Sequence, residues 1–234
     1  MITFDLRKHI QGDYKSKVEK LKAKGKTFYL REGTECCEII LDDTCYVYTN
    51  KSRFPSNKLF LFKMVRHDAD EFLQAHSNIV LPKERHVAFY NYDYDDSYGT
   101  IVGTDLNHAY WRIAYNLGII SAKTYNKGLG QECKALRLAT LSTLGREKSY
   151  TYYEKGTSVN VIKQKEKDED ASTLYKLIRF TCYTMMREAA DLLGDDFDCW
   201  KTDCIYYRDS EQNREKVNSY FQSQGMDFKI LEFA

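Results

Sequence analysis

Residues 101–121 of the chain are IVGTDLNHAYWRIAYNLGIIS, and residues 134–145 are KALRLATLSTLG. The first segment opens with a short apolar run, which predicts a strand over 101–104, and Asp105 follows at its end. A carboxylate where a strand gives way to a helix can hold a metal ion at the edge of a sheet. Asp105 is therefore the first candidate for a metal ligand.

A helix is predicted directly after Asp105. Ala109, Ile113 and Leu117 recur at the i, i+4, i+8 spacing of one buried helical face. Much farther along the chain, Asp203 lies in the segment WKTDCIYY, between two strand-like runs. Two carboxylates on neighbouring strands are the smallest set of protein ligands that can bind a pair of divalent ions for phosphoryl transfer.

Three segments resemble motifs of family B DNA polymerases. The segment DLNHAY, 105–110, is similar to motif A, in which a metal-binding Asp is followed five positions later by a Tyr. The segment RLATLSTLG, 137–145, resembles the fingers motif, with Leu141 and Leu144 in place of Asn and Tyr. The segment KTDC, 201–204, resembles motif C, with a Lys in place of the first Asp. The three motifs follow the family's order.

The resemblance implies a role for each matched residue. Asp105 and Asp203 would be catalytic and would bind two Mg²⁺ or Mn²⁺ ions, helped by the Leu106 carbonyl. The other roles fall to residues around the nucleotide: Tyr110 would lie under the sugar, Lys134 and Arg137 would neutralise the phosphates, and Lys201 would contact the primer or template. Lys134 and Arg137 are spaced i, i+3 and share a helical face, so a solvent-facing pair is the alternative.

The element order from residue 101 onward predicts the fold independently of the motifs. When residues 107–163 are set aside, periodicity predicts strand, helix, strand, strand, helix, strand, which is the split βαβ, ferredoxin-like order. The resemblance implies the same order, because it is that of a polymerase palm. We therefore expect an α+β protein with a palm-like domain over 98–234 and a helical fingers insertion at 107–165. That insertion ends in a hairpin over 149–163.

Residues 1–97 predict a separate α+β region whose role the sequence does not indicate. Asp13 should cap a helix that ends at Gly25, and a second helix is predicted over 68–76. Runs of β-branched and aromatic residues predict strands at 27–31, 38–41, 45–49, 58–65, 78–81 and 86–92. No strand carries the closely spaced acidic pair of a proofreading exonuclease, and no thumb is recognisable after 201–204.

The composition excludes several classes of protein. The net charge of +1 argues against a basic chain that coats nucleic acid, although a local basic patch remains possible. There is no apolar run of membrane-spanning length and no apolar segment of a secretory signal at the start. Seven cysteines without a CxxC pair indicate reduced thiols and no zinc site. We expect a cytoplasmic protein, in the host cytoplasm if it is phage-encoded.

Three functional hypotheses follow. The first is a minimal family B-like DNA polymerase or nucleotidyltransferase whose partners are a DNA primer–template, dNTPs and other replication proteins, without a membrane. The second is a catalytically idle palm that binds nucleic acid as a replication accessory. The third is a structural or assembly protein on a ferredoxin-like scaffold, since fold alone does not fix function. Both carboxylates and Tyr110 favour the first hypothesis, whereas Lys201 argues against it.

Overall fold

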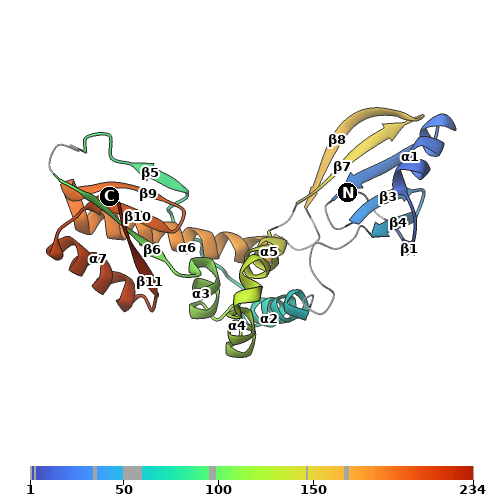
Figure 1. Ribbon diagram of the computed structural model, residues 1–234. Helices are drawn as coiled ribbons and strands as arrows, with labels where there is room; N and C mark the ends of the chain where they lie inside the picture. Colours follow the sequence, from blue (N-terminus) through green and yellow to red (C-terminus); the bar gives the residue numbers. More distant parts are fainter. Residues whose placement is uncertain are drawn as a thin grey trace. The chain divides into compact units, whose positions relative to one another are not determined.

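The computed structural model describes residues 2, 4–33, 36–49, 60–94, 99–145, 147–165 and 169–233. The chain divides into two compact units, each built from two segments (Figure 1). The first unit comprises Met1–Phe60 and Arg146–Glu169, and the second comprises Leu61–Gly145 and Asp170–Ala234. Both units combine helices and a sheet, so the α+β class predicted from the sequence is confirmed.

The first unit contains a six-stranded sheet in the order β1-β4-β3-β2-β7-β8. Its strands are β1 (Leu6–Ile10), β2 (Phe28–Glu32), β3 (Cys36–Leu41), β4 (Thr44–Thr49), β7 (Glu147–Glu154) and β8 (Thr157–Lys165). β1 runs parallel to β4, and the other pairs are antiparallel. Helix α1 (Tyr14–Ala23) packs Val18 and Leu21 against this sheet, and Asp13 caps it by accepting from the backbone amides of Lys15 and Ser16.

The second unit contains a five-stranded antiparallel sheet in the order β11-β6-β10-β9-β5. Its strands are β5 (Ala88–Tyr90), β6 (Ile101–Leu106), β9 (Phe197–Lys201), β10 (Cys204–Arg208) and β11 (Phe228–Glu232). β9 and β10 form the predicted hairpin, and β6 and β10 are central neighbours. Gly103 on β6 permits close packing, because a Cβ there would lie 3.2 Å from the Tyr206 ring.

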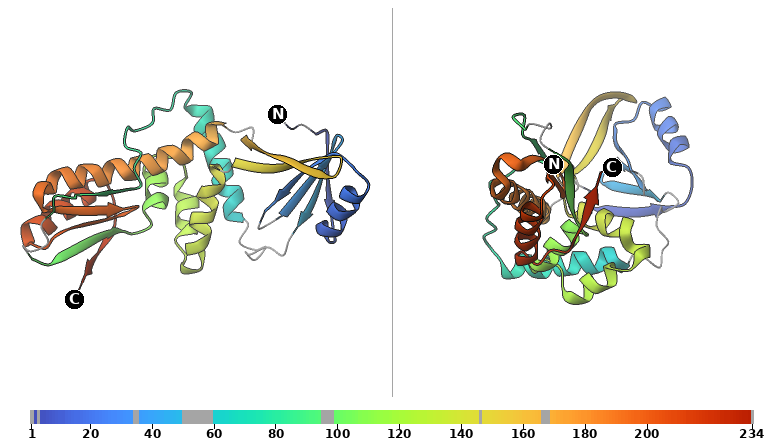
Figure 2. Two further views of the ribbon diagram at one scale, coloured as in Figure 1. Left: turned by 90° about the horizontal axis from the view of Figure 1, so that it is seen from above. Right: turned by 60° about the vertical axis from the view of Figure 1, so that its left-hand side comes forward.

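Two long helices cover one face of this second sheet (Figure 2). They are α6 (Glu169–Leu193) and α7 (Glu211–Ser223), and the Tyr220 hydroxyl on α7 donates to Glu188 on α6. The remaining helices are α2 (Phe60–Ala75), α3 (Ala109–Asn116), α4 (Ala122–Gly128) and α5 (Lys134–Leu144), with short 3₁₀ turns η3 (Gln131–Cys133) and η4 (Gly194–Asp196). Because neighbouring residues of a strand face opposite ways, buried Thr104 and Leu106 face opposite to Asp105.

The strand predicted at 58–65 is wrong where the structure describes it. Residues 60–75 form one helix, α2, which also absorbs most of the helix predicted at 68–76. Leu61, Val65 and Ala69 are buried at the i, i+4, i+8 spacing of a helix. This helical period outweighs the β-propensity of the aromatic residues at the start of the segment. Residues 78–81, predicted as a strand, form no regular element.

The two units are divided differently from the predicted boundaries at 97 and 107–165. α2 and β5 belong to the second unit, with the carboxylates, whereas the hairpin β7–β8 belongs to the first. Tyr152 of β7 pairs with Tyr29 of β2, and the Tyr150 hydroxyl donates to the buried carboxylate of Glu38 at 2.7 Å. The helices α3–α5 remain beside β6, so only this helical part of the predicted insertion lies in the second unit.

Candidate functional site

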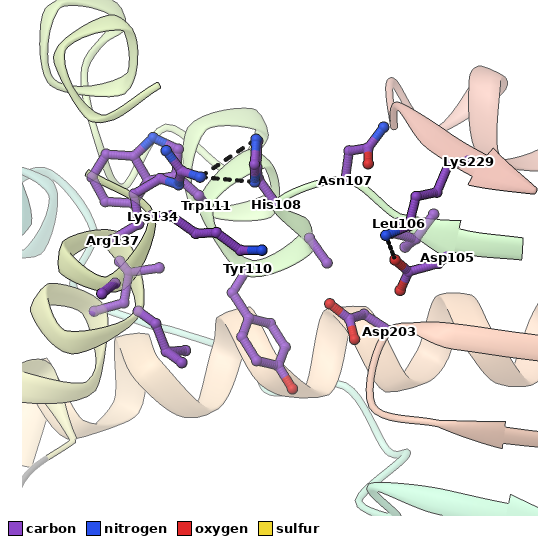
Figure 3. A pocket seen from close by; sticks show the side chains of 14 residues that line it. Asp105, Leu106, Asn107, His108, Tyr110, Trp111, Lys134, Arg137, Asp203 and Lys229 are labelled. Carbon is purple, nitrogen blue, oxygen red and sulfur yellow. Dashed lines mark hydrogen bonds and ion pairs between the residues drawn. The ribbon is translucent and has the colours of Figure 1, made fainter. Parts of the chain in front are cut away.

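Asp105 and Asp203 lie next to each other at one end of the second sheet (Figure 3). Asp105 is on β6, directly opposite Cys204 of β10, and Asp203 precedes Cys204 in the β9–β10 turn. The backbone amide of Leu106 donates to the Asp203 carbonyl at 2.9 Å, which extends the ladder past the end of β10. The structure therefore brings the two distant carboxylates together, with Asp105 on a strand and Asp203 one residue before the neighbouring strand.

A strained backbone position holds the turn that carries Asp203. Thr202 has φ 59°, in the left-handed region, which a β-branched residue rarely adopts. The Thr202 amide donates to the Val87 carbonyl at 2.7 Å, and its carbonyl accepts from the Cys182 thiol at 3.6 Å. Such strain persists only where surrounding contacts fix the conformation, and it is concentrated at functional sites.

The two carboxylates differ in their electrostatic environment. Burial, together with the neighbouring charge of Asp105, raises the pKa of Asp203 above its ordinary value. Asp105 instead forms an ion pair with Lys229, whose ammonium lies 2.9 Å from Oδ2 of Asp105. The pair therefore concentrates negative charge at a partly buried position, and Lys229 neutralises one member.

The carboxylates line a pocket of about 540 Å³ that lies entirely within the second unit. The structure brings six of the seven predicted site residues into its wall, namely Asp105, Leu106, Tyr110, Lys134, Arg137 and Asp203. The amine of Lys134 points from α5 in the direction of the carboxylates (Figure 3). The pocket thus has an acidic end on the sheet and a basic side on α5.

Tyr110 occupies a half-buried position on the first turn of α3. Its neighbours Ala109 and Trp111 are buried, whereas its ring lines the pocket next to Asp203 (Figure 3). Its hydroxyl lies 3.4 Å from the hydroxyl of Tyr183, which in turn accepts from Arg179 at 3.0 Å. Burial and the contact with Tyr183 raise the pKa of Tyr110, so the phenol stays protonated.

Arg137 is buried in the pocket wall, and much of its donor capacity is already used. The guanidinium donates to the carbonyls of Gly128 and Gly130 and lies 3.0 Å from Nδ1 of His108. Burial and the positive charge of Arg137 lower the pKa of His108, so a neutral imidazole can accept this hydrogen bond. These contacts join α4, α5 and the start of α3, and the predicted contact of Arg137 with a triphosphate remains a prediction.

Lys201 lies outside the pocket. Its ammonium lies 5.5 Å from the centre of the Tyr90 ring, on the neighbouring edge strand β5. It can still contact a chain that approaches along that edge, although the structure does not place it among the residues around the carboxylates.

Of the pocket residues that were missed from the sequence, three have hydrophilic side chains: Asn107, His108 and Lys229. His108 could have been suspected from the sequence, because it directly precedes a predicted helix. In the structure it adopts the left-handed region, with φ 54°. Lys229 could not have been suspected from the sequence, because the pairing of β11 with β6 is what puts Lys229 opposite Asp105. Only the register of a non-local strand pair creates this contact.

The donor set fits Mg²⁺ or Mn²⁺ held by few protein ligands. Among the residues that the structure describes, no group of three or more His, Cys, Asp or Glu side chains could hold a metal. Mg²⁺ is commonly bound by one or two carboxylates plus substrate phosphates, so Asp105 and Asp203 suffice for such a site. Burial and the neighbouring charge of Asp105 raise the pKa of Asp203, and a bound divalent ion would offset the repulsion between the two carboxylates.

Comparison with known proteins gave no relatives: no family model, no curated protein and no solved structure matches the chain. None of the described helices combines the length and apolar character of a membrane span. The function is therefore inferred from the geometry of the pocket.

Proposed function

We propose that the protein is a minimal family B-like DNA polymerase or nucleotidyltransferase that adds dNTPs to a primer hydroxyl. The observation that carries this proposal is that Asp105 on β6 and Asp203 in the turn before β10 lie in one pocket with Tyr110 and Lys134. The substrates would be a DNA primer–template and dNTPs, and other replication proteins are expected partners.

The strand order of the second unit supports the proposal. With β5 set aside, the order β11-β6-β10-β9 is that of two interleaved split βαβ units, the ferredoxin-like arrangement expected of a polymerase palm. α6 leads into the β9–β10 hairpin and α7 leads into β11, so both helices occupy the crossover positions of that fold. Asp105 lies on the central strand β6, and Asp203 lies in the turn that leads into its neighbour β10.

The charged residues and Tyr110 of the pocket would have the following roles in the proposed reaction. Asp105 and Asp203 would hold two divalent ions, which when bound lower the pKa of the primer hydroxyl and stabilise charge on the leaving pyrophosphate. Lys134 would bind the phosphates of the incoming nucleotide. Tyr110 would lie beneath its sugar and exclude a 2′-hydroxyl by its bulk. Arg137 would hold His108 and so support the wall of the pocket.

A second candidate is a catalytically idle palm that binds nucleic acid. The ion pair between Lys229 and Asp105 favours it, because it already neutralises one of the two carboxylates. Lys201 adds another cation where the resemblance implies an acid. Against this reading, both carboxylates and the half-buried Tyr110 are retained in one pocket.

Primer extension with Mg²⁺ or Mn²⁺ tests the proposal directly. We expect the wild-type chain to extend a primer with dNTPs, and Asp105→Asn and Asp203→Asn each to reduce extension to background. Each replacement removes one of two neighbouring like charges, so the melting temperature should stay unchanged or rise. Asp191→Asn, on an exposed position of α6, is the matched control and should extend normally.

Two results would contradict the proposal. One is the absence of extension by the wild-type chain with either metal on DNA primer–templates. The other is wild-type extension by both carboxylate variants. A folded chain that binds DNA without extending it would favour the idle palm.

A further inference from the structure

Lys229 is the one described cation that forms an ion pair with either carboxylate. It lies on β11 directly opposite Asp105 of β6, so the two side chains are cross-strand neighbours on one face of the sheet. Leu231 follows on the same face beside Gly103, whereas Phe228, on the opposite face, packs near Phe221 of α7. The strand register, and not a flexible loop, therefore delivers the ammonium to Oδ2 of Asp105.

The ammonium changes the charge that a divalent ion would meet. Asp105 and Asp203 alone present two negative charges, and Lys229 reduces this to a net single charge at the acidic end of the pocket. Its Nζ also lies 2.9 Å from one of the carboxylate oxygens that a metal would use. Lys229 therefore opposes a free divalent ion both by repulsion and by occupying a ligand atom.

The same ammonium can move away from Asp105 without breaking the fold. The side chain of Lys229 is 57% exposed, and Asp105 is its sole ion-pair partner among the described residues. Asp105 is 25% exposed and Lys229 is more exposed, so the ammonium remains accessible to another anion that can replace Asp105 as its partner. A phosphate that enters the pocket is such an anion, because Lys229 and Lys134 line the same pocket.

We propose that Lys229 is an internal counter-cation that competes with free divalent ions for Asp105 and favours metal that arrives together with a nucleoside triphosphate. This inference rests on the proposed function, because it assumes that Asp105 and Asp203 hold metal. A free ion must displace the ammonium and leave it unpaired, whereas a metal–triphosphate complex supplies the phosphate that pairs with it. Lys229 thereby makes metal binding depend on nucleotide binding.

The test compares two dissociation constants in the full chain, without primer. The first is that of free Mn²⁺, from the electron paramagnetic resonance signal of unbound ion, and the second is that of dTTP at saturating Mn²⁺. Lys229→Met keeps most of the length of the side chain and removes its charge. We expect free Mn²⁺ to bind about five- to tenfold tighter to this variant and dTTP to bind several-fold more weakly.

Two controls separate this effect from general changes. Lys216→Met removes an exposed positive charge from α7 in the same unit and should shift neither constant. Asp105→Asn should weaken Mn²⁺ binding in the wild-type background, which shows that the carboxylates bind the ion. Thermal melts of all variants check that each is folded.

The outcomes distinguish the inference from the function on which it rests. Carboxylate-dependent Mn²⁺ binding that Lys229→Met leaves unchanged or weakens overturns the inference and leaves the proposed function standing. Tighter Mn²⁺ binding without weaker dTTP binding overturns the coupling to nucleotide. Mn²⁺ binding that is absent from both the wild type and Lys229→Met, or that Asp105→Asn leaves unchanged, overturns the metal site itself and the inference with it.

Discussion

Tyr110 contributes both to the packing of α3 and to the wall of the pocket. It sits between buried Ala109 and buried Trp111, yet its ring is half-buried and lines the pocket beside Asp203. A helix turns about 100° per residue, so adjacent positions face different surroundings. The hydroxyl contact with Tyr183 is long, at 3.4 Å, so the ring itself contributes most of what Tyr110 does at this place.

Substitution of Tyr110 should separate ring volume from the hydroxyl. If the ring excludes a 2′-hydroxyl, Tyr110→Phe keeps the preference for dNTPs over rNTPs, and Tyr110→Ala admits rNTPs. Because the ring is only half-buried, Tyr110→Ala should destabilise the fold by less than the roughly 3–5 kcal/mol of a core aromatic truncation. The measurement pairs primer extension with each nucleotide type and a thermal melt. Loss of stability by Tyr110→Ala without new rNTP use would assign the ring to packing alone.

The elements around the pocket were largely predictable from local sequence. The strand before Asp105 and the two strands on either side of Asp203 follow from periodicity, and the structure confirms them. The first part of helix α2 was predicted as a strand because its first residues, FLF, favour strand and helix alike. The contact of Lys229 and the pairing of β7 with β2 depend on partners far along the chain, which local patterns do not specify.

The wall of the pocket depends on close packing between α3 and α4. A Cβ at Gly128, the last residue of α4, would lie 2.3 Å from the buried ring of Trp111 on α3. The indole of Trp111 donates to the Tyr125 carbonyl, so the ring has little freedom to retreat. The Gly128 carbonyl also accepts from Arg137, so displacement of α4 would disturb the guanidinium that holds His108.

Gly128→Ala should therefore destabilise the protein by about 1–3 kcal/mol, the usual cost of overpacking a core. Gly130→Ala is the matched control in the same segment, because a Cβ there would meet only the flexible end of the Glu132 side chain. Urea unfolding of both variants measures the difference in the free energy of unfolding. Equal stability of Gly128→Ala and the wild type would show that Trp111 can shift without cost.

At the scale of the whole molecule, the chain leaves the second unit once and returns to it. It passes from α5 into the hairpin β7–β8, which belongs to the first unit, and comes back into α6. The hairpin is antiparallel, and Glu147 pairs with Lys165, so its outgoing and incoming ends are adjacent. Every residue that lines the pocket lies in the second unit, on either side of this excursion.

The second unit should therefore fold by itself once the hairpin is removed. A chain of residues 61–145 joined to 170–234 by a short Gly/Ser linker keeps the entire five-stranded sheet and the pocket. We expect it to be monomeric by size-exclusion chromatography, to unfold cooperatively on heating, and to retain the Mn²⁺ affinity of the full chain.

The control for this excision keeps the hairpin and removes only residues 1–60. That chain loses β2, the pairing partner of β7, together with Glu38, the acceptor of the buried Tyr150 hydroxyl. An unpaired strand edge with exposed aromatic residues favours association between chains, so the control should aggregate where the linked chain does not. If the linked chain is unfolded while the control is monomeric and cooperative, the hairpin supports the second unit, and the division into independent units is wrong.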